Sequence, residues 1–287
     1  MATFHIQTHA RLQEWVADEN GYFKDEGLRY VFTSSTNGFD MGNQRREKGA
    51  PEVKSGAFES YRENNGNKGA GRSDVSCACH WAVNQAAVEN AGNVYRDAYV
   101  ITPGAVMVRA DSHVRTPEDL ANVGIAVGYH SGSHFTTVQA LETFLKREEI
   151  NLKFIGTPMK RLDAIFDGDV EAVSVWGLSC QILDQLGFRR IVDATFMITF
   201  MFPKDSDPAD VEKYMRGLKR AQMEIDLRPE RYKKHYLNEI PDRFKNMVDV
   251  RRFGTGERVV FLPYTEETFR QTRDWIKEHN LFADAAD

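Results

Sequence analysis

Short apolar segments typical of buried strands alternate with helical segments along most of this 287-residue chain. Strands are expected at residues 124–127, 152–156 and 190–192, and a turn followed by a strand is expected within 168–176. Helices are expected between them at 136–146, 159–166 and 180–186. A further strand–helix–strand unit is expected over residues 3–7, 11–20 and 29–33. Because successive parallel strands need crossover connections, this alternation predicts a parallel, doubly wound α/β architecture.

Composition limits the classes of partner. Hydrophobic residues make up 41% of the chain and charged residues 28%, which is ordinary for a globular protein with room for two lobes. The net charge of −5 gives no reason to expect a nucleic-acid partner. No apolar run approaches the roughly 20 residues of a membrane span. The first residues lack the apolar core of a signal peptide, and the cysteine count is odd, so we expect a cytoplasmic protein.

Two of the three cysteines fall in the segment 73–81, Ser-Asp-Val-Ser-Cys-Ala-Cys-His-Trp. A strand is expected at 74–76 and a helix at 81–89, which places Cys77, Cys79 and His80 at or near a helix N-terminus. The field there favours anions and lowers the pKa of a thiol. The segment therefore predicts either an anion site or a reactive thiolate.

Several short sequence segments occur along the chain in an order that indicates a family resemblance. They are Gly-Tyr-Phe-Lys-Asp-Glu-Gly-Leu at 21–28, Arg-Ser-Asp-Val at 72–75, the segments 108–120, 124–134 and 168–176, and Tyr-Thr-Glu-Glu at 264–267. Together they span nearly the whole chain and resemble the nitrate/taurine/alkanesulfonate substrate-binding proteins and their thiamine-pyrimidine synthase-like relatives. The resemblance implies the type II periplasmic-binding-protein fold.

In that fold two α/β lobes are joined by hinge strands, and a ligand lies in the cleft between them. The resemblance implies a first lobe of residues 1–104 plus 201–287 and a second lobe of residues 105–200. Residues 37–56 look like an insertion relative to the family. They belong to a polar, glycine-rich stretch, 34–72, which is a candidate lid.

Ligands of such sheets bind at the carboxyl ends of the strands. The first segment that this rule selects follows strand 3–7 and contains Thr8, His9 and Arg11. Thr8 and Arg11 are candidate substrate contacts. His9 is a candidate general acid or base, and capping of the following helix is an equally open alternative.

The second segment contains the two cysteines. Cys77 and Cys79 are candidate catalytic thiols with His80 as their neighbouring imidazole, and Trp81 is a candidate ligand contact. For each cysteine, packing in the core is the main alternative, because cysteine is among the most buried residue types. A Cys-x-Cys-His metal site is disfavoured because no second pair has zinc-ligand spacing, and we expect neither metal nor cofactor.

The third segment is 129–134, Tyr-His-Ser-Gly-Ser-His, before an expected helix. Backbone N–H groups and hydroxyls at a helix N-terminus suit an oxyanion, and in the family this loop contacts the anionic group of the ligand. The candidate substrate contacts are Tyr129, His130, Ser131, Gly132, Ser133 and His134. The fourth place is Trp176, directly after its strand, which is expected either to contact ligand or to seal the lobe interface.

The resemblance implies two classes of function. One is a cytoplasmic lyase that removes a carboxylate or sulfinate group from a small, aromatic organic acid, because the group includes a sulfinate desulfinase and aromatic-acid decarboxylases. The other is a solute-binding protein of an ABC transporter for a small organic anion, such as a sulfonate, carboxylate or pyrimidine-like compound. A ligand-sensing domain is a third alternative. Histidines and cysteines near one cleft favour the lyase. No cysteine occupies the loop after the first strand, where the desulfinase nucleophile is expected, so its activity does not transfer residue by residue.

Overall fold

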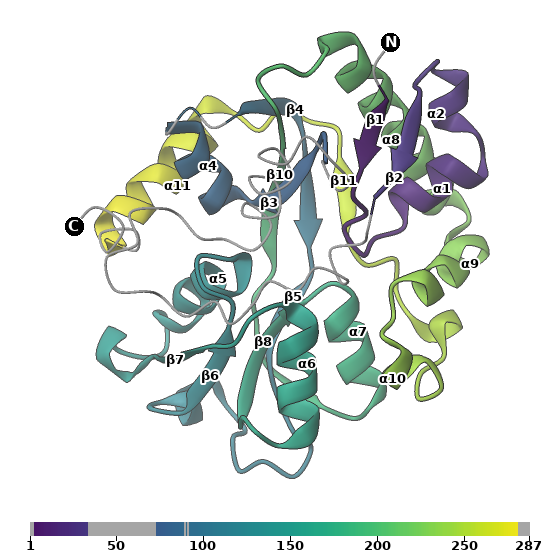
Figure 1. Ribbon diagram of the computed structural model, residues 1–287. Coiled ribbons are helices and arrows are strands. Elements are labelled where there is room, and N and C mark those ends of the chain that lie inside the picture. Colours follow the sequence, from purple (N-terminus) through teal and green to yellow (C-terminus); the bar gives the residue numbers. More distant parts are fainter. Residues whose placement is uncertain (1–2, 34–72, 89, 91, 281–287) are drawn as a thin grey trace.

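Two stretches of chain cross between the two halves of the molecule (Figure 1). The computed structural model describes residues 3–33, 73–88, 90 and 92–280. Strand β4 (Asn93–Thr102) passes through Pro103 into β5 (Gly104–Val108), and β9 (Arg189–Asp193) leads into β10 (Phe196–Phe202). In each case the first and second strand belong to different sheets. The protein is therefore made of two α/β lobes joined by hinge strands.

The first lobe holds a four-stranded antiparallel sheet and a two-stranded parallel one. The larger sheet has the order β11-β4-β10-β3, with β3 at Ser76–Cys79 and β11 at Arg258–Val260. Strands β1 (Phe4–Ile6) and β2 (Tyr30–Phe32) pair in parallel across α1 (Gln13–Glu19) and α2 (Tyr22–Asp25). The expected strand–helix–strand unit at the start of the chain is confirmed.

The second lobe holds a five-stranded sheet in the order β7-β6-β8-β5-β9. Strand β6 (Gly124–Val127) runs parallel to both β7 (Asn151–Phe154) and β8 (Ala172–Trp176). The hinge-derived strand β5 runs antiparallel to β8 and β9. The α/β class is confirmed, but this sheet is mixed rather than purely parallel, because the strand that enters from the hinge runs opposite to the central ones.

Helices surround the sheets of both lobes. Those of the second lobe are α5 (Gly132–Leu141), α6 (Pro158–Asp167) and α7 (Leu178–Gln185). Those of the first lobe, besides α1 and α2, are α4 (His80–Val88), α8 (Pro208–Leu227), α9 (Pro229–Tyr232), α10 (Asp242–Lys245) and α11 (Glu266–His279). The last of these packs beside α4, far from it in sequence (Figure 1). No described helix is long and apolar enough to cross a membrane.

Several boundaries differ from the expected ones. Helix α5 runs from Gly132 to Leu141 instead of over 136–146. Strand β3 extends through Cys79 because it pairs with β10 from Ser76 to Cys79. The candidate lid at 34–72, its insertion at 37–56 and Arg72 lie outside the described residues. The predicted lobe boundaries stay a prediction.

The hinge segments touch each other closely. Ala194 N donates to Gly104 O at 2.9 Å, and Gly177 N donates to Pro103 O at 2.8 Å. A Cβ at position 104 would lie 2.5 Å from Ala194 O, closer than any stable contact, so only glycine fits there. This contact ties the two crossings together beside the end of β8.

Candidate functional site

A buried histidine–carboxylate pair lies where the loop after β1 meets the residue before β11. His9 Nδ1 lies 3.2 Å from Glu257 Oε2, and the two residues are only 5% and 2% exposed. No described residue forms a hydrogen bond with His9 Nε2. A carboxylate that accepts from Nδ1–H leaves the lone pair at Nε2, the arrangement used to hold a general base in one tautomer.

Trp176, from the other lobe, stacks on this histidine. The ring centroids of His9 and Trp176 are 5.2 Å apart and the planes differ by 9°. Phe196, where β10 begins, packs edge-on against the same indole with centroids 6.2 Å apart. Two residues selected from separate segments of the sequence are thus brought together across the lobe boundary.

Three polar atoms around this pair are buried and have no hydrogen-bond partner among the described residues. They are Arg11 Nη1, Trp176 Nε1 and Glu257 Oε1. Arg11 Nη1 lies 3.9 Å from Glu257 Oε2, and a Cβ at Gly177 would lie 3.7 Å from Glu257 Oε1. Since native proteins rarely leave buried polar groups unpaired, this concentration at one place indicates a polar ligand or ordered water.

A buried network of hydrogen bonds holds Arg11 in place. Its Nε donates to both carboxylate oxygens of Glu14, at 3.0 and 2.9 Å, and its Nη2 pairs with the same carboxylate. Tyr214 also donates to Glu14, at 2.9 Å. Burial opposes ionisation of Glu14, but the charge and hydrogen bonds of Arg11 outweigh it and lower the pKa of Glu14. Arg11 is therefore mainly committed to Glu14, with only Nη1 facing the site.

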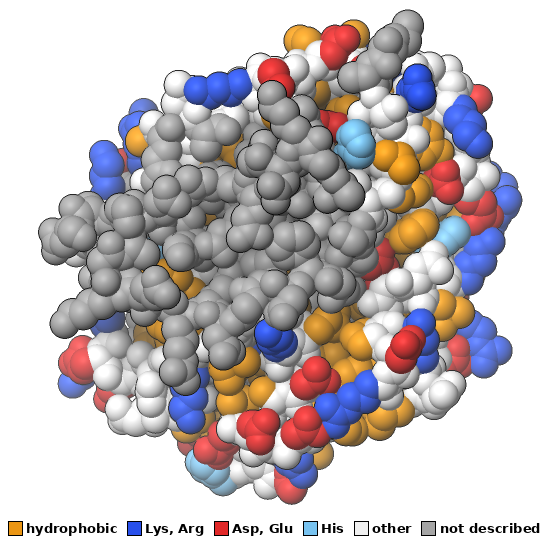
Figure 2. All heavy atoms as spheres, viewed as in Figure 1, with side chains coloured by type: hydrophobic (Ala, Val, Ile, Leu, Met, Phe, Trp, Pro, Cys, Tyr) orange, Lys and Arg blue, Asp and Glu red, His pale blue; other side chains and the backbone are white. Residues whose placement is uncertain are grey.

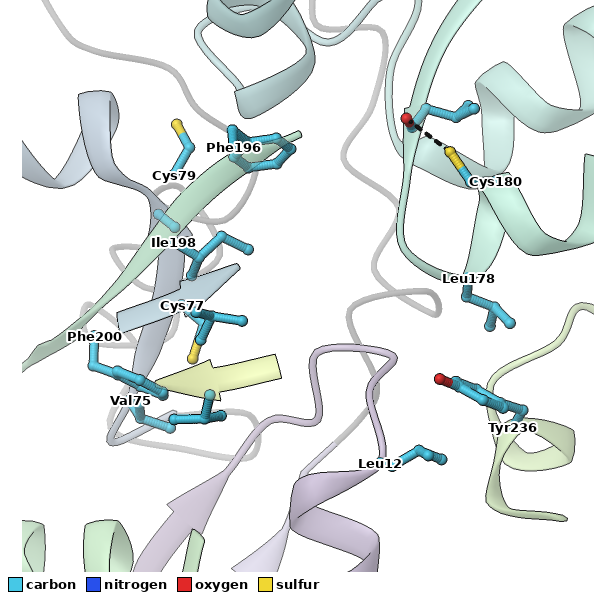
Figure 3. Close-up of a cluster of buried hydrophobic side chains, with 14 of the residues drawn as sticks. Leu12, Val75, Cys77, Cys79, Leu178, Cys180, Phe196, Ile198, Phe200 and Tyr236 are labelled. Carbon is cyan, nitrogen blue, oxygen red and sulfur yellow. Dashed lines mark hydrogen bonds between the residues drawn. The ribbon is translucent and has the colours of Figure 1, made fainter. Parts of the chain in front are cut away.

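The cysteines lie just before the N-terminus of α4, as expected: Cys79 directly precedes His80, the first residue of the helix. Both cysteines belong to β3, and their sulfur atoms point in different directions (Figure 3). Cys77 Sγ lies 3.4 Å from Arg11 Nη2. Burial raises the pKa of Cys77 to about 12 although the Arg11 charge lowers it, and burial also raises the pKa of Cys79 to about 12 against the nearby N–H groups of Ala82 and Trp81. The expectation that the helix field lowers the thiol pKa is wrong, because desolvation of the thiolate is the larger effect.

His80 and Trp81 sit behind this strand. His80 Nδ1 lies 3.1 Å from Thr272 Oγ1 and 3.4 Å from Tyr264 Oη, and burial lowers the pKa of His80 to about 3. Trp81 is 1% exposed; its ring neighbours are Phe135, Phe196 and Trp275. His80 packs within the first lobe against α11, and Trp81 lies between α11 and α5 of the second lobe.

The loop at residues 128–133, called the serine loop, supplies the N-cap residue of α5 and is held by hydrogen bonds within itself. Ser131 Oγ donates to Gly128 O at 2.7 Å, and Ser133 Oγ accepts from Gly128 N at 3.0 Å. The two hydroxyl oxygens are 2.8 Å apart. The hydroxyls thus fix the loop, and Gly132 begins the helix against the ring of Phe196.

The aromatic residues of this loop form a stack. The rings of Tyr129 and His130 are 3.9 Å apart, and those of His130 and His134 are 6.0 Å apart and nearly parallel. His130 N donates to His134 Nδ1 at 3.3 Å, and burial lowers the pKa of His134 to about 3. The neutral His134 ring therefore provides shape and a hydrogen-bond acceptor rather than charge. Thr8, the remaining candidate, is buried beside His9.

Two residues of the site were not expected from the sequence. Glu257 precedes a strand of three residues that carries no periodic pattern. Arg161 lies on α6 and looks like a solvated helix residue, yet it is 1% exposed. The sequence around a polar residue does not show that it is buried when the residue lies on an amphipathic helix or beside a strand that has no recognisable pattern.

Other parts of the described structure are weaker candidates for a functional site. No group of three His, Cys, Asp or Glu side chains within it could hold a metal ion. A cavity of about 550 Å³ lies at the amino ends of β6 and β8, where Arg109 pairs with Asp111 and His113 with Glu171. Positive and negative side chains are also interspersed around the described surface in Figure 2. The carboxyl ends of the strands, with His9 and Trp176, remain the best-supported site.

Comparison with known proteins gives the fold. No family model and no curated protein matches the sequence. The alkanesulfonate-binding protein SsuA from Xanthomonas axonopodis pv. citri, bound to MOPS, is 15% identical with a TM-score of 0.69, covering 98% of this chain and 94% of that one. The desulfurization enzyme DSZB is 12% identical with a TM-score of 0.60, covering 98% and 93%.

A third similar structure is a Candida albicans protein described as defining a new family with the generic periplasmic binding protein structural fold. It is 13% identical with a TM-score of 0.65, covering 100% of this chain and 96% of that one. At these identities the likeness shows the fold alone. This chain has the periplasmic-binding-protein fold, which solute-binding proteins and a desulfurization enzyme share.

Proposed function

We propose that this protein is a cytoplasmic enzyme that binds a small organic acid where the lobes meet and removes its carboxylate or sulfinate group. The observation that carries the proposal is the buried His9–Glu257 pair, stacked under Trp176 and surrounded by unpaired polar atoms. Binding alone does not require a carboxylate that orients an imidazole, whereas proton transfer does.

The proposed step replaces a C–C or C–S bond by a C–H bond. His9 in its protonated form donates from Nε2 to the carbon that bears the leaving group, and the bond to CO₂ or SO₂ breaks. The carboxylate or sulfinate anion and one proton become R–H and CO₂ or SO₂, and water converts SO₂ to sulfite. Glu257 stabilises the imidazolium before transfer, and solvent returns the proton to His9 afterwards.

The remaining residues would bind and orient the acid. Trp176 offers an indole face and an unpaired N–H to an aromatic ring or its substituent. The N-terminus of α5 offers backbone dipoles to the anionic group. The cysteines have no step in this mechanism, because thiols with a pKa near 12 are poor nucleophiles at neutral pH.

The second candidate function is a solute-binding protein for a small organic anion. The TM-score of 0.69 to an alkanesulfonate-binding protein favours it. That function needs the same lobe interface and the same anion contacts, but no turnover. The two candidates therefore differ in one observable, consumption of the bound acid.

A screen of aromatic and aliphatic carboxylates, sulfinates and sulfonates by thermal shift, followed by mass spectrometry of each stabilising compound, tests the proposal. The lyase predicts that at least one stabilising carboxylate or sulfinate is converted to its R–H product. Stabilising ligands that are all recovered unchanged would establish the solute-binding alternative.

A further inference from the structure

Arg161 is a buried cation with no anionic partner among the described residues. Its Nε donates to Ser174 O at 3.1 Å and its Nη1 donates to Gly156 O at 2.7 Å. Its Nη2 is buried and has no hydrogen-bond partner among the described residues, and no described carboxylate forms an ion pair with it. Removing a guanidinium from water without a counter-charge is costly, so this arrangement calls for an explanation.

The guanidinium of Arg161 lies next to the serine loop. A Cβ at Gly128 would come within 2.8 Å of both Arg161 Nη1 and Ser131 Oγ, so the two groups flank the same backbone position. Ser131 is the N-cap of α5, a helix of ten residues, and Ser133 Oγ in its first turn accepts from Gly128 N directly after β6. The charge of Arg161 and the positive end of the α5 dipole thus add at one point.

Bridging of strand ends is the structural alternative. Arg161 does join carbonyl groups that follow β7 and lie within β8. That role uses Nε and Nη1 and leaves both Nη2 and the full positive charge unexplained. Burial lowers the pKa of Arg161 to about 9, which still leaves the guanidinium charged at neutral pH.

We propose that Arg161 is the counter-charge of an oxyanion, a carboxylate, sulfinate or sulfonate, bound at the N-terminus of α5. The choice of organic oxyanions rests on the proposed function, but the site itself requires only binding. In this arrangement Arg161 sets the preference of the protein for anionic over neutral ligands, and the internally bonded serine loop holds the α5 N-terminus in place.

The test is calorimetric binding of benzenesulfonate and benzoate, with benzenesulfonamide and benzamide as neutral isosteres. Wild-type protein is expected to bind at least one anion about tenfold or more tightly than its isostere, a gap that corresponds to about 1.4 kcal/mol. Arg161→Gln should abolish the gap without weakening the neutral compound, and Arg161→Lys should keep part of it. Arg109→Gln, an exposed arginine of the same lobe paired with Asp111, should bind like wild type.

Equal loss of anion and amide binding in Arg161→Gln would reduce Arg161 to a structural role and overturn the proposal. So would a wild-type protein that binds neither anion better than its isostere. If Arg161→Gln does not fold, a crystal structure of wild type with benzenesulfonate decides: the sulfonate must lie at the N-terminus of α5. Failure of turnover leaves these binding results unaffected, so the two proposals fail separately.

Discussion

His9 and Trp176 stack across the boundary between the two lobes, with ring centroids 5.2 Å apart and planes 9° from parallel. His9 follows the end of β1, and Trp176 is the last residue of β8 in the other lobe. The contact therefore couples the relative position of the lobes to the environment of the His9–Glu257 pair. A ligand that binds beside the stacked rings contacts both lobes at once.

Trp176→Ala should weaken binding of the acid identified in the thermal-shift screen by about tenfold, because it removes both the indole face and the N–H donor. Trp176→Phe keeps an aromatic face and should recover most of that loss. Isothermal titration of the two variants provides the measurement. Equal affinities for wild type and Trp176→Ala would show that the indole does not contact the ligand.

The thiols of native protein should react with iodoacetamide at pH 8 at less than about one hundredth of the rate of a free thiol, because burial keeps them protonated. Labelling in urea should reach all three cysteines and serves as the control. Cys77→Ala and Cys79→Ala should keep turnover within about twofold of wild type. Rapid labelling of Cys77, or lost turnover in a folded variant, would restore a nucleophilic role.

The sequence predicts those elements of the fold that are determined by residues close together in the chain, and it misses those that depend on distant contacts. The strands β6 and β8 were expected because buried runs followed by helical periodicity identify them locally. The expected strand at 74–76 ended too early, because Cys79 belongs to it through pairing with Ile198 of β10, a contact far away in sequence. Glu257 was missed for the same reason, since β11 exists only through its pairing with β4.

For the candidate site, too, the sequence predicts some features and not those that depend on distant contacts. His9 and Trp176 were selected by a topological rule, that ligands lie at the carboxyl ends of strands, and the structure brings them together. Burial and charge balance are not visible in a single sequence. That is why the raised thiol pKa of Cys77 and the unpaired charge of Arg161 emerge only from the fold.

The free energy of unfolding should fall as the pH drops from 7 to 5. The pKa of His80 and of His134 is about 3 in the folded protein, below the roughly 6.5 of an unfolded histidine. The unfolded chain therefore binds more protons in this window, and the stability present above pH 6.5 is lost as the pH falls toward 3. Each histidine should account for about 2 kcal/mol at pH 5.

Urea titrations at pH 7, 6 and 5 measure this effect. His80→Asn should reduce the slope of stability against pH by the share of one histidine, whereas His113→Asn, at an exposed position, should not change it. An identical slope for wild type and His80→Asn would show that His80 is not buried in its neutral form.

Glu14→Gln should destabilise the protein by about 3–5 kcal/mol, because it leaves the buried Arg11 guanidinium without its main counter-charge. Tyr214→Phe removes only one neutral donor from the same carboxylate and should cost about 1 kcal/mol. Urea denaturation at pH 7 compares the two variants. Similar small losses for both would mean that Glu14 and Arg11 do not form the buried pair described above.

The most direct test of the account is a double-mutant cycle on His9 and Glu257, measured as kcat for the acid identified in the screen. His9→Asn should lower kcat by about 10²–10⁴-fold. If Glu257 acts only by orienting and stabilising His9, adding Glu257→Gln to His9→Asn should cause no further loss, although Glu257→Gln alone lowers kcat. Turnover that survives in His9→Asn, or losses that simply multiply in the double variant, would contradict the proposed proton-transfer pair.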